Sequence, residues 1–92
     1  MGKTIVKCKG APGAVGPYSQ AVALNGWLWT SGQVALNPET GKLAGSDAAT
    51  QADQALRNVK AILEEAGSSM GQVVRATVYL TDMDDFAAVN EV

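Results

Sequence analysis

Few residues in this sequence could do chemistry, because the chain contains no histidine. The absence of histidine excludes Ser-His and Cys-His nucleophile pairs, histidine acid–base catalysis and the commonest zinc ligand. The single cysteine, Cys8, is flanked only by Lys7 and Lys9, and we interpret it as a small, half-buried hydrophobe and not as a nucleophile. Much of ordinary hydrolytic chemistry is therefore excluded.

Two hydroxyl-bearing residues stand out by their positions. Tyr18 follows a Gly-Pro pair in a loop, where it could simply cover the core. Ser31 begins a Ser-Gly-Gln run at the end of an otherwise bulky predicted strand, which is an unusual place to lose side-chain volume. This position favours a ligand-binding role for Ser31 over a purely structural one.

Two further patterns are weaker signals. The spaced glycines of residues 10–16 resemble a phosphate cradle only superficially, because neither a helix former nor a Lys-Ser/Thr pair follows them. The three aspartates within residues 82–85 suit a helix N-terminus, where they cap the first turn and oppose the helix dipole. Without histidine they are a poor signal for a divalent ion, and we predict no metal site.

Composition and charge indicate a globular protein that does not bind nucleic acid. Of the 92 residues 47% are hydrophobic and 17% charged, which is enough to form a core and unlike a disordered chain. The net charge is −2, and the seven Lys and Arg residues cluster only at Lys3, Lys7 and Lys9. A nucleic-acid or membrane partner is therefore not expected. One cysteine and no long apolar run favour a cytoplasmic protein.

The length predicts a single domain spanning residues 1–92. A monomer of this size buries only about 60–65% of the surface that its unfolded chain exposes. We therefore expect part of its stability to come from a partner.

The order of elements predicts an α+β fold. The pair Asn25-Gly26 between two strand-like runs is typical of a type I′ hairpin turn. Trp27 and Trp29 share one face of the second run, which we interpret as packing and not recognition. The expected strands are 4–9, 19–24, 27–34 and 73–80, with a loop at 10–17 and a turn at 37–41. A helix is expected at 47–66, with Ser46 or Asp47 as its N-cap and Gly67 after its C-terminus. A second helix is expected from Thr81 or Asp82, with Met83, Phe86 and Val89 as its apolar stripe.

The second predicted helix reaches Val92 without a cap. No Gly or Asn follows its last turn, and that turn carries no basic residue. A helix broken off in this way also leaves an α+β layer without covering strands. We expect the chain to lack C-terminal strands and its site to be incomplete.

Six runs, taken in order, carry a resemblance to a known family. They are AVGPYSQ at 14–20, WTSGQ at 29–33, NPETG at 37–41, AILEEAG at 61–67, VYLTD at 78–82 and FAAVN at 86–90. Together they closely resemble the reactive intermediate deaminase family, Rid, also called YjgF, which has the endoribonuclease L-PSP-like fold.

The resemblance implies a fold, an assembly and an activity. The implied fold is similar to chorismate mutase, with a β-sheet packed by two helices, and the implied assembly is a homotrimer with a ligand cleft at each subunit interface. The implied activity is that of a 2-iminobutanoate/2-iminopropanoate deaminase, which hydrolyses enamine or imine intermediates such as 2-aminoacrylate to 2-keto acids and ammonia. It uses no cofactor.

By the same resemblance, four residues contribute to the cleft. Tyr18 and Ser31 supply catalytic hydroxyls, Gly32 allows close approach of substrate to the backbone, and Asn90 lies at the rim as a substrate-binding residue. The hydroxyl groups suit a reaction in which a proton donor assists tautomerisation and a water attacks the imine carbon.

The family's carboxylate-binding arginine and water-positioning glutamate lie on later strands, beyond Val92. We therefore expect the 92-residue form to be inactive and only the full-length protein to be an enzyme. Arg57 and Arg75 could replace the arginine. Solvated or structural roles fit both better, because Arg57 falls on the polar face of the first helix and Arg75 on a strand face with Thr77.

Two alternative functions stay open. Some relatives keep the cleft without the arginine, so a non-catalytic ligand-binding or regulatory trimer is the first alternative. Ribonuclease or translation-inhibiting activity is the second, and the missing basic patch and missing histidine argue against it.

Overall fold

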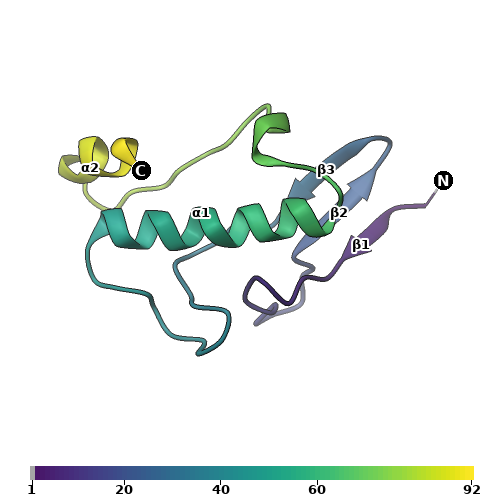
Figure 1. Ribbon diagram of the computed structural model, residues 1–92, viewed down its shortest axis with the longest axis horizontal. Helices are drawn as coiled ribbons and strands as arrows, with labels where there is room; N and C mark the ends of the chain where they lie inside the picture. Colours follow the sequence, from purple (N-terminus) through teal and green to yellow (C-terminus); the bar gives the residue numbers. More distant parts are fainter. Residues whose placement is uncertain (1) are drawn as a thin grey trace.

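The structure is a computed structural model that describes residues 2–92. It is an α+β fold in which one long helix lies over a small antiparallel sheet (Figure 1). In chain order the elements are β1 Thr4–Val6, β2 Ala21–Leu24, β3 Trp27–Thr30, α1 Ala48–Glu65, the 3₁₀ turns Met70–Gln72 and Met83–Asp85, and α2 Phe86–Glu91. None of the described helices is long and apolar enough to cross a membrane.

The sheet has three strands in the order β1-β2-β3, and both pairs are antiparallel. Asn25 and Gly26 form the hairpin turn with φ of 53° and 81°, as a type I′ turn requires, so this prediction is confirmed. Each strand is shorter than predicted at one end, because β1 and β3 end earlier and β2 begins later. Ser31 lies just past β3, but its N–H still donates to the Gln20 carbonyl at 2.9 Å.

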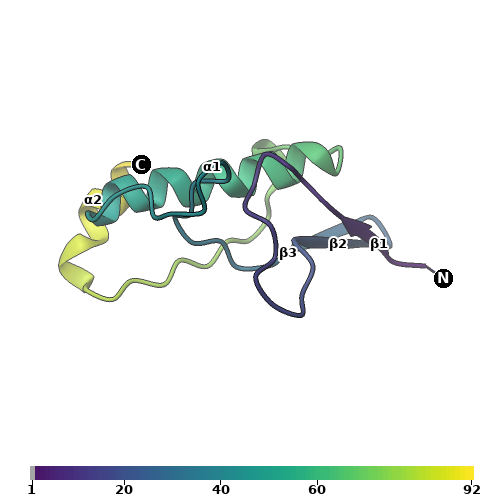
Figure 2. The same ribbon diagram turned by 90° about the horizontal axis from the view of Figure 1, so that it is seen from below.

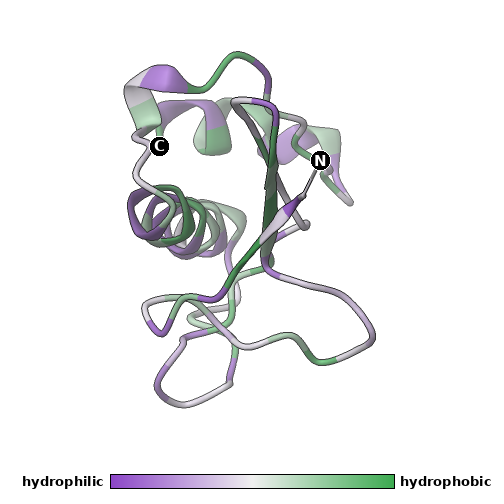
Figure 3. Cartoon of the chain, turned by 90° about the vertical axis from the view of Figure 1, so that its right-hand side faces the viewer, coloured by the Kyte–Doolittle hydropathy of each residue, from purple (hydrophilic) through white to green (hydrophobic). Residues whose placement is uncertain are grey.

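The two faces of the sheet differ in what covers them. Val6, Ala21 and Ile62 form the buried core between the sheet and α1, with Leu28 packed against it. Figure 2 shows the helix and the strands as two layers, and Figure 3 shows the hydrophobic side of α1 turned toward the strands. The opposite face stays open among the described residues. It carries Ile5, Val22, Leu24, Trp27 and Trp29 at paired register positions.

The two tryptophans do not pack into the core of the chain. Their side chains are 56% and 66% exposed, and the ring centroids lie 6.4 Å apart in a tilted arrangement. The prediction that Trp27 and Trp29 serve packing is therefore not met within one chain. Their exposure leaves an aromatic surface on the open face of the sheet.

Local capping signals define α1 almost as predicted. The Asp47 carboxylate accepts hydrogen bonds from the Thr50 N–H and hydroxyl, each at 2.9 Å, so Asp47 and not Ser46 is the N-cap. The bond from the Thr50 N–H is the main reason that the pKa of Asp47 lies below its usual value. The cap stabilises the fold fully at a pH above the ordinary carboxyl pKa. This stabilisation is lost as the pH falls through the lowered pKa of Asp47.

The C-terminus of α1 is a Schellman motif. Gly67 has φ of 83°, the Ser68 N–H donates to the Leu63 carbonyl at 2.8 Å, and the Gly67 N–H donates to the Glu64 carbonyl at 3.0 Å. The predicted end of the helix is therefore confirmed.

Two buried amides hold the loops that flank the sheet. The Gln20 side chain accepts from the Cys8 N–H at 2.6 Å and donates to the carbonyls of Cys8, Ala11 and Pro12 at 3.0, 3.3 and 2.8 Å. Asn58 on α1 is fully buried and donates to the Val34 and Leu36 carbonyls at 3.2 and 2.9 Å. Buried polar groups need such partners, so Gln20 fixes the loop after β1 and Asn58 fixes the chain that follows Ser31.

The predicted strand at 73–80 is wrong for this structure. Figure 1 shows the segment as an extended chain that starts near β3 and runs along α1 toward α2. No backbone hydrogen bond joins residues 74–80 to any other described residue. Val74 and Val78, which share the apolar face of the alternation, are 78% and 63% exposed, and only Leu80 is partly covered. Alternating side chains suit a strand, but a strand also needs a neighbour to complete its ladder.

The second helix begins as predicted, but it buries little apolar surface. The Asp82 carboxylate accepts from the Asp84 N–H at 2.9 Å and caps the 3₁₀ turn that leads into α2. Met83 and Phe86 of the predicted apolar stripe are exposed. Figure 1 shows α2 at the N-terminal end of α1 and not over the strands, so only one of the two expected helices covers the sheet.

We predict that Gln20→Glu destabilises the fold by about 3 kcal/mol, because the new carboxylate would face three carbonyl oxygens in a buried position. Burial raises the pKa of the introduced carboxyl. The protonated form can donate again, so the loss should shrink at acidic pH. Urea denaturation monitored by tryptophan fluorescence at several pH values measures both effects.

The matched control is Gln72→Glu, because the Gln72 amide oxygen only accepts hydrogen bonds, from Ser68 and Ser69, on an exposed residue. The control should change stability by less than about 0.5 kcal/mol. Equal losses in the two variants would contradict the role assigned to Gln20.

Candidate functional site

A groove runs along the outer edge of β3, between this strand and the extended segment 73–77. Its volume is about 790 Å³. Side chains of α1 line it from below, including Leu56, Val59 and Leu63, and β3 contributes Trp27 and Trp29. Most of the groove is therefore apolar.

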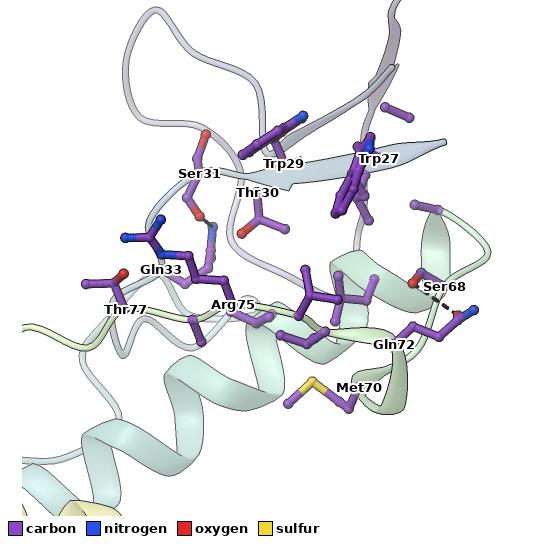
Figure 4. A pocket seen from close by; sticks show the side chains of 18 of the residues that line it. Trp27, Trp29, Thr30, Ser31, Gln33, Ser68, Met70, Gln72, Arg75 and Thr77 are labelled. Atoms are coloured by element: carbon purple, nitrogen blue, oxygen red, sulfur yellow. Dashed lines mark hydrogen bonds between the residues drawn. The ribbon is translucent and has the colours of Figure 1, made fainter. Parts of the chain in front are cut away.

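Polar side chains gather at one end of the groove. Ser31 and Gln33 follow β3, and Arg75 and Thr77 lie across from them on the extended segment. Figure 4 shows the Arg75 side chain reaching from its segment toward the side of the groove where Ser31 and Gln33 lie. Hydroxyl, amide and guanidinium groups thus converge on one region beside an apolar surface, an arrangement typical of small-molecule sites.

Ser31 is held in place by the neighbouring strand. Its hydroxyl donates to the Ser19 carbonyl at 2.5 Å, and its own carbonyl accepts a long, 3.5 Å bond from the Gln33 side chain. Because the hydroxyl proton is engaged, the Ser31 oxygen faces a ligand as an acceptor. This arrangement suits holding a water molecule or a protonated nitrogen.

Gly32 presents bare backbone to the groove. A Cβ built at this position would meet no atom within 4 Å. Its N–H donates to no acceptor among residues 2–92. The space and the available donor both allow a ligand to approach the backbone closely.

Tyr18 and Asn90 do not line this groove. The Tyr18 side chain is 46% exposed in the loop before β2, and its hydroxyl oxygen accepts from the Val15 N–H at 3.3 Å. Asn90 is exposed on α2. Within one chain, the structure thus brings Ser31 and Gly32 together and leaves Tyr18 and Asn90 outside the groove.

The two candidate arginines have different surroundings. The Arg57 Nε donates to the Asp53 carboxylate at 2.7 Å on the exposed side of α1, and this bond raises the pKa of Arg57. The solvated role predicted for Arg57 is confirmed. Arg75 instead lines the groove and forms no ion pair within residues 2–92.

Sequence reasoning placed Arg75 on a polar strand face but did not identify it as a groove residue. Its spacing from Thr77 is no signal for the groove, because residues 73–77 all line it whichever face they share. What the sequence could not show was which surface that face meets. Among residues 2–92 no group of three or more His, Cys, Asp or Glu side chains could hold a metal ion.

Fold and site together define an α+β protein with an edge groove, polar at one end, of a size suited to a small molecule. The family model described as Endoribonuclease L-PSP matches residues 8–92. The 2-iminobutanoate/2-iminopropanoate deaminase of Escherichia coli is 50% identical over 90 residues, which cover 98% of this chain and 69% of the relative. The chain therefore belongs to the Rid/YjgF/L-PSP family.

Solved structures agree with this assignment. A conserved Rid family protein of unknown function from Yersinia pestis superposes with a TM-score of 0.95 at 40% identity, over 98% of this chain and 71% of that one. The structure of E. coli TdcF with bound serine gives a TM-score of 0.92 at 45% identity, over 96% of this chain and 68% of that one. The chain thus spans about 70% of the length of the proteins it matches.

Proposed function

We propose that the full-length protein hydrolyses small 2-imino acids and their enamine tautomers, such as 2-aminoacrylate. In this reaction a water adds to the imine carbon and the C–N bond breaks, so that imine and water become 2-keto acid and ammonia. The supporting observation is the 50% identity to a 2-iminobutanoate/2-iminopropanoate deaminase across 98% of the chain. The hydrolysis changes no overall oxidation state, so its balance calls for no redox cofactor.

The groove offers groups for two requirements of this reaction. The Ser31 oxygen, with its proton engaged by Ser19, accepts a hydrogen bond and can orient the attacking water. The unpaired Gly32 N–H can donate to an oxygen of the substrate. Both groups are backbone-anchored next to the sheet, which favours a defined position for the reacting atoms.

Tyr18 is the candidate proton donor for tautomerisation, and it does not line the groove of its own chain. We propose that it reaches the site of a neighbouring copy in a homotrimer, in which Asn90 lies at the rim. The open sheet face supports an assembly of this kind, because Trp27 and Trp29 expose an aromatic surface there.

Sedimentation of the complete gene product tests the assembly. We expect three copies for the wild type and dissociation for Trp29→Glu, because a carboxylate on the open face opposes burial of that face. The control Leu43→Glu alters an exposed loop residue outside the groove and away from Tyr18, and it should leave the assembly intact. A monomeric wild type would exclude the trimer.

A non-catalytic ligand-binding role is the second candidate. It is supported by the relative TdcF, whose structure holds serine, a small molecule with the carboxylate and amino groups of the proposed substrates. Binding without turnover distinguishes this role from catalysis. Ribonuclease activity is less well supported despite the name of the family model, because the net charge is −2 and the groove contains a single cationic side chain.

The activity test couples the complete gene product to an enzyme that releases 2-aminoacrylate from serine. We expect pyruvate to form faster than in the uncatalysed control, with ammonia released in equal amount. Replacing Ser31 by Ala should lower kcat by about 10- to 100-fold, because the water would lose its acceptor. Absence of any acceleration by the wild-type protein would refute the deaminase proposal.

Gly32→Ala tests close approach of ligand to the backbone. The added Cβ meets no protein atom within 4 Å, so stability should change by less than about 0.5 kcal/mol. If a ligand approaches this backbone, the methyl group should weaken its binding by about 10-fold or more. Calorimetric titration with pyruvate measures the affinity.

Gly13→Ala is the matched control, because its Cβ also meets nothing within 4 Å and the residue lies outside the groove. It should change neither stability nor affinity. Unchanged pyruvate binding in Gly32→Ala would remove Gly32 from the site.

A further inference from the structure

The loop between β1 and β2 carries Tyr18 but makes few contacts of its own. Residues 13–18 are all exposed, whereas the residues directly before and after them are at least partly covered. The two hydrogen bonds of this stretch are local, since Tyr18 donates from its N–H to the Gly16 carbonyl and accepts at its hydroxyl from the Val15 N–H. No hydrogen bond joins residues 13–18 to any other described residue. The position of Tyr18 is therefore set where the loop begins and ends.

The Gln20 side chain joins the two ends of this loop. It lies at the C-terminal end, is only 6% exposed, and donates from its Nε2 back to the carbonyls of Ala11 and Pro12 at 3.3 and 2.8 Å. The same amide exchanges hydrogen bonds with the backbone of Cys8 at 2.6 and 3.0 Å. A loop whose ends are held together has far fewer conformations than a free one, so Gln20 restricts the whole loop.

Gln20 also connects the loop to the groove. Its backbone carbonyl accepts from the Ser31 N–H at 2.9 Å, and the Ser31 hydroxyl donates to the carbonyl of Ser19 at 2.5 Å. The base of the Tyr18 loop and the residue that can orient the water therefore belong to one hydrogen-bonded frame. The Gln20 amide fixes the start of the loop in this frame, and Ser31 fixes its end.

We propose that Gln20 is a positioning residue for the reaction, because it determines where the Tyr18 hydroxyl is presented. This inference rests on the proposed function, in which Tyr18 donates the proton for tautomerisation. The Tyr18 oxygen accepts from Val15, and its own proton has no acceptor among the described residues, so this proton is available to a substrate. Gln20 is buried and does not line the groove, so it acts through Tyr18 and not on the substrate.

The packing of the Tyr18 ring cannot replace the role of Gln20. A Cβ built at Gly16 would lie 3.6 Å from two carbon atoms of the ring, so the ring packs on its own loop. This contact moves with the loop and does not fix the loop relative to the sheet. A proton donor must come within about 2.6–3.2 Å of its acceptor. A displacement of about 1 Å can lower a rate about 100-fold, so a loosened loop should be costly to catalysis.

The test is a double-mutant cycle between Gln20→Met and Tyr18→Phe in the complete gene product. Methionine has a similar length but forms none of the amide hydrogen bonds. We expect Gln20→Met to lower kcat about 10-fold or more while changing KM less. Tyr18→Phe should lower kcat about 10-fold or more in the wild type but less than about 3-fold in Gln20→Met, because the hydroxyl is already misplaced there. Effects that simply multiply would overturn the inference.

Asp47→Ala controls for a loss of stability alone. It removes the N-cap of α1, a different element from the loop, and so lowers stability without touching the frame around Gln20. It should leave kcat unchanged, and its effect should multiply with that of Tyr18→Phe. Circular dichroism gives the folded fraction of each variant, by which every kcat is divided.

Gln20→Glu supplies a second variant with a pH readout. Burial raises the pKa of the introduced carboxyl, and below that pKa its O–H can donate to a loop carbonyl. We expect the kcat of folded Gln20→Glu, relative to the wild type at the same pH, to recover as the pH falls through this pKa. A purely structural role would change the folded fraction and not this ratio. If Gln20→Met does not fold, this profile decides, and a ratio that stays constant with pH would overturn the inference.

A measurement that needs no turnover separates this inference from the proposed function. We expect ¹⁵N order parameters for the amides of residues 13–16 and 18 near 0.85 in the wild type and below about 0.6 in Gln20→Met. Unchanged order parameters would overturn the role of Gln20, whether or not the wild type turns over substrate. A loosened loop in a protein without turnover would support the positioning of Tyr18 by Gln20 and refute the deaminase proposal.

Discussion

Within residues 2–92 the outer edge of β3 is unpaired, and the candidate site depends on this edge. β3 pairs with β2 on one side only, and residues 73–77 run beside its other side without completing the ladder. An unpaired edge leaves backbone N–H and C=O groups without partners, which folded proteins normally cover or use for binding. The edge is bordered here by the apolar side chains of α1, so the groove joins hydrogen-bonding groups to a hydrophobic surface.

Two buried side-chain amides fix the position of this edge of the sheet. Gln20 ties the loop after β1 to the start of β2, and Asn58 ties the chain after β3 to α1. Ser31 lies between these anchors and adds its own bond to the Ser19 carbonyl. The residues at the polar end of the groove are therefore held by side chains that never touch a ligand, and their positions follow from the packing of α1 on the sheet.

The sequence predicted structure correctly where the signal is local. It failed where the structure of a segment depends on which other segment pairs with it or covers it. The Asn25-Gly26 turn, the Asp47 cap and the Gly67 terminus each follow from the backbone preference of one or two residues. Residues 73–80 have the alternation of a strand, but alternation does not specify which edge the strand pairs with. The same limit applies to Trp27 and Trp29, whose exposure depends on what covers the open face of the sheet.

The candidate site was predictable only in part. Ser31 could be singled out by the loss of volume at the end of a strand, whereas Gly32 was assigned by the family resemblance, and the structure places both on the groove. Arg75 could not be placed on the groove from the sequence, because its position there depends on where the extended segment lies relative to β3. Tyr18 and Asn90 were assigned to a cleft by family resemblance alone, and their positions outside the groove make their contribution a question of assembly.

The central claim is that the polar end of this groove is where a small 2-oxo or 2-imino acid binds. Titration of pyruvate into ¹⁵N-labelled complete gene product, followed by amide chemical shifts, tests it most directly. The account predicts that the largest shift changes occur at Ser31, Gly32, Arg75 and Thr77, with little change on the exposed face of α1. Shift changes centred elsewhere, with these four amides unaffected, would contradict it.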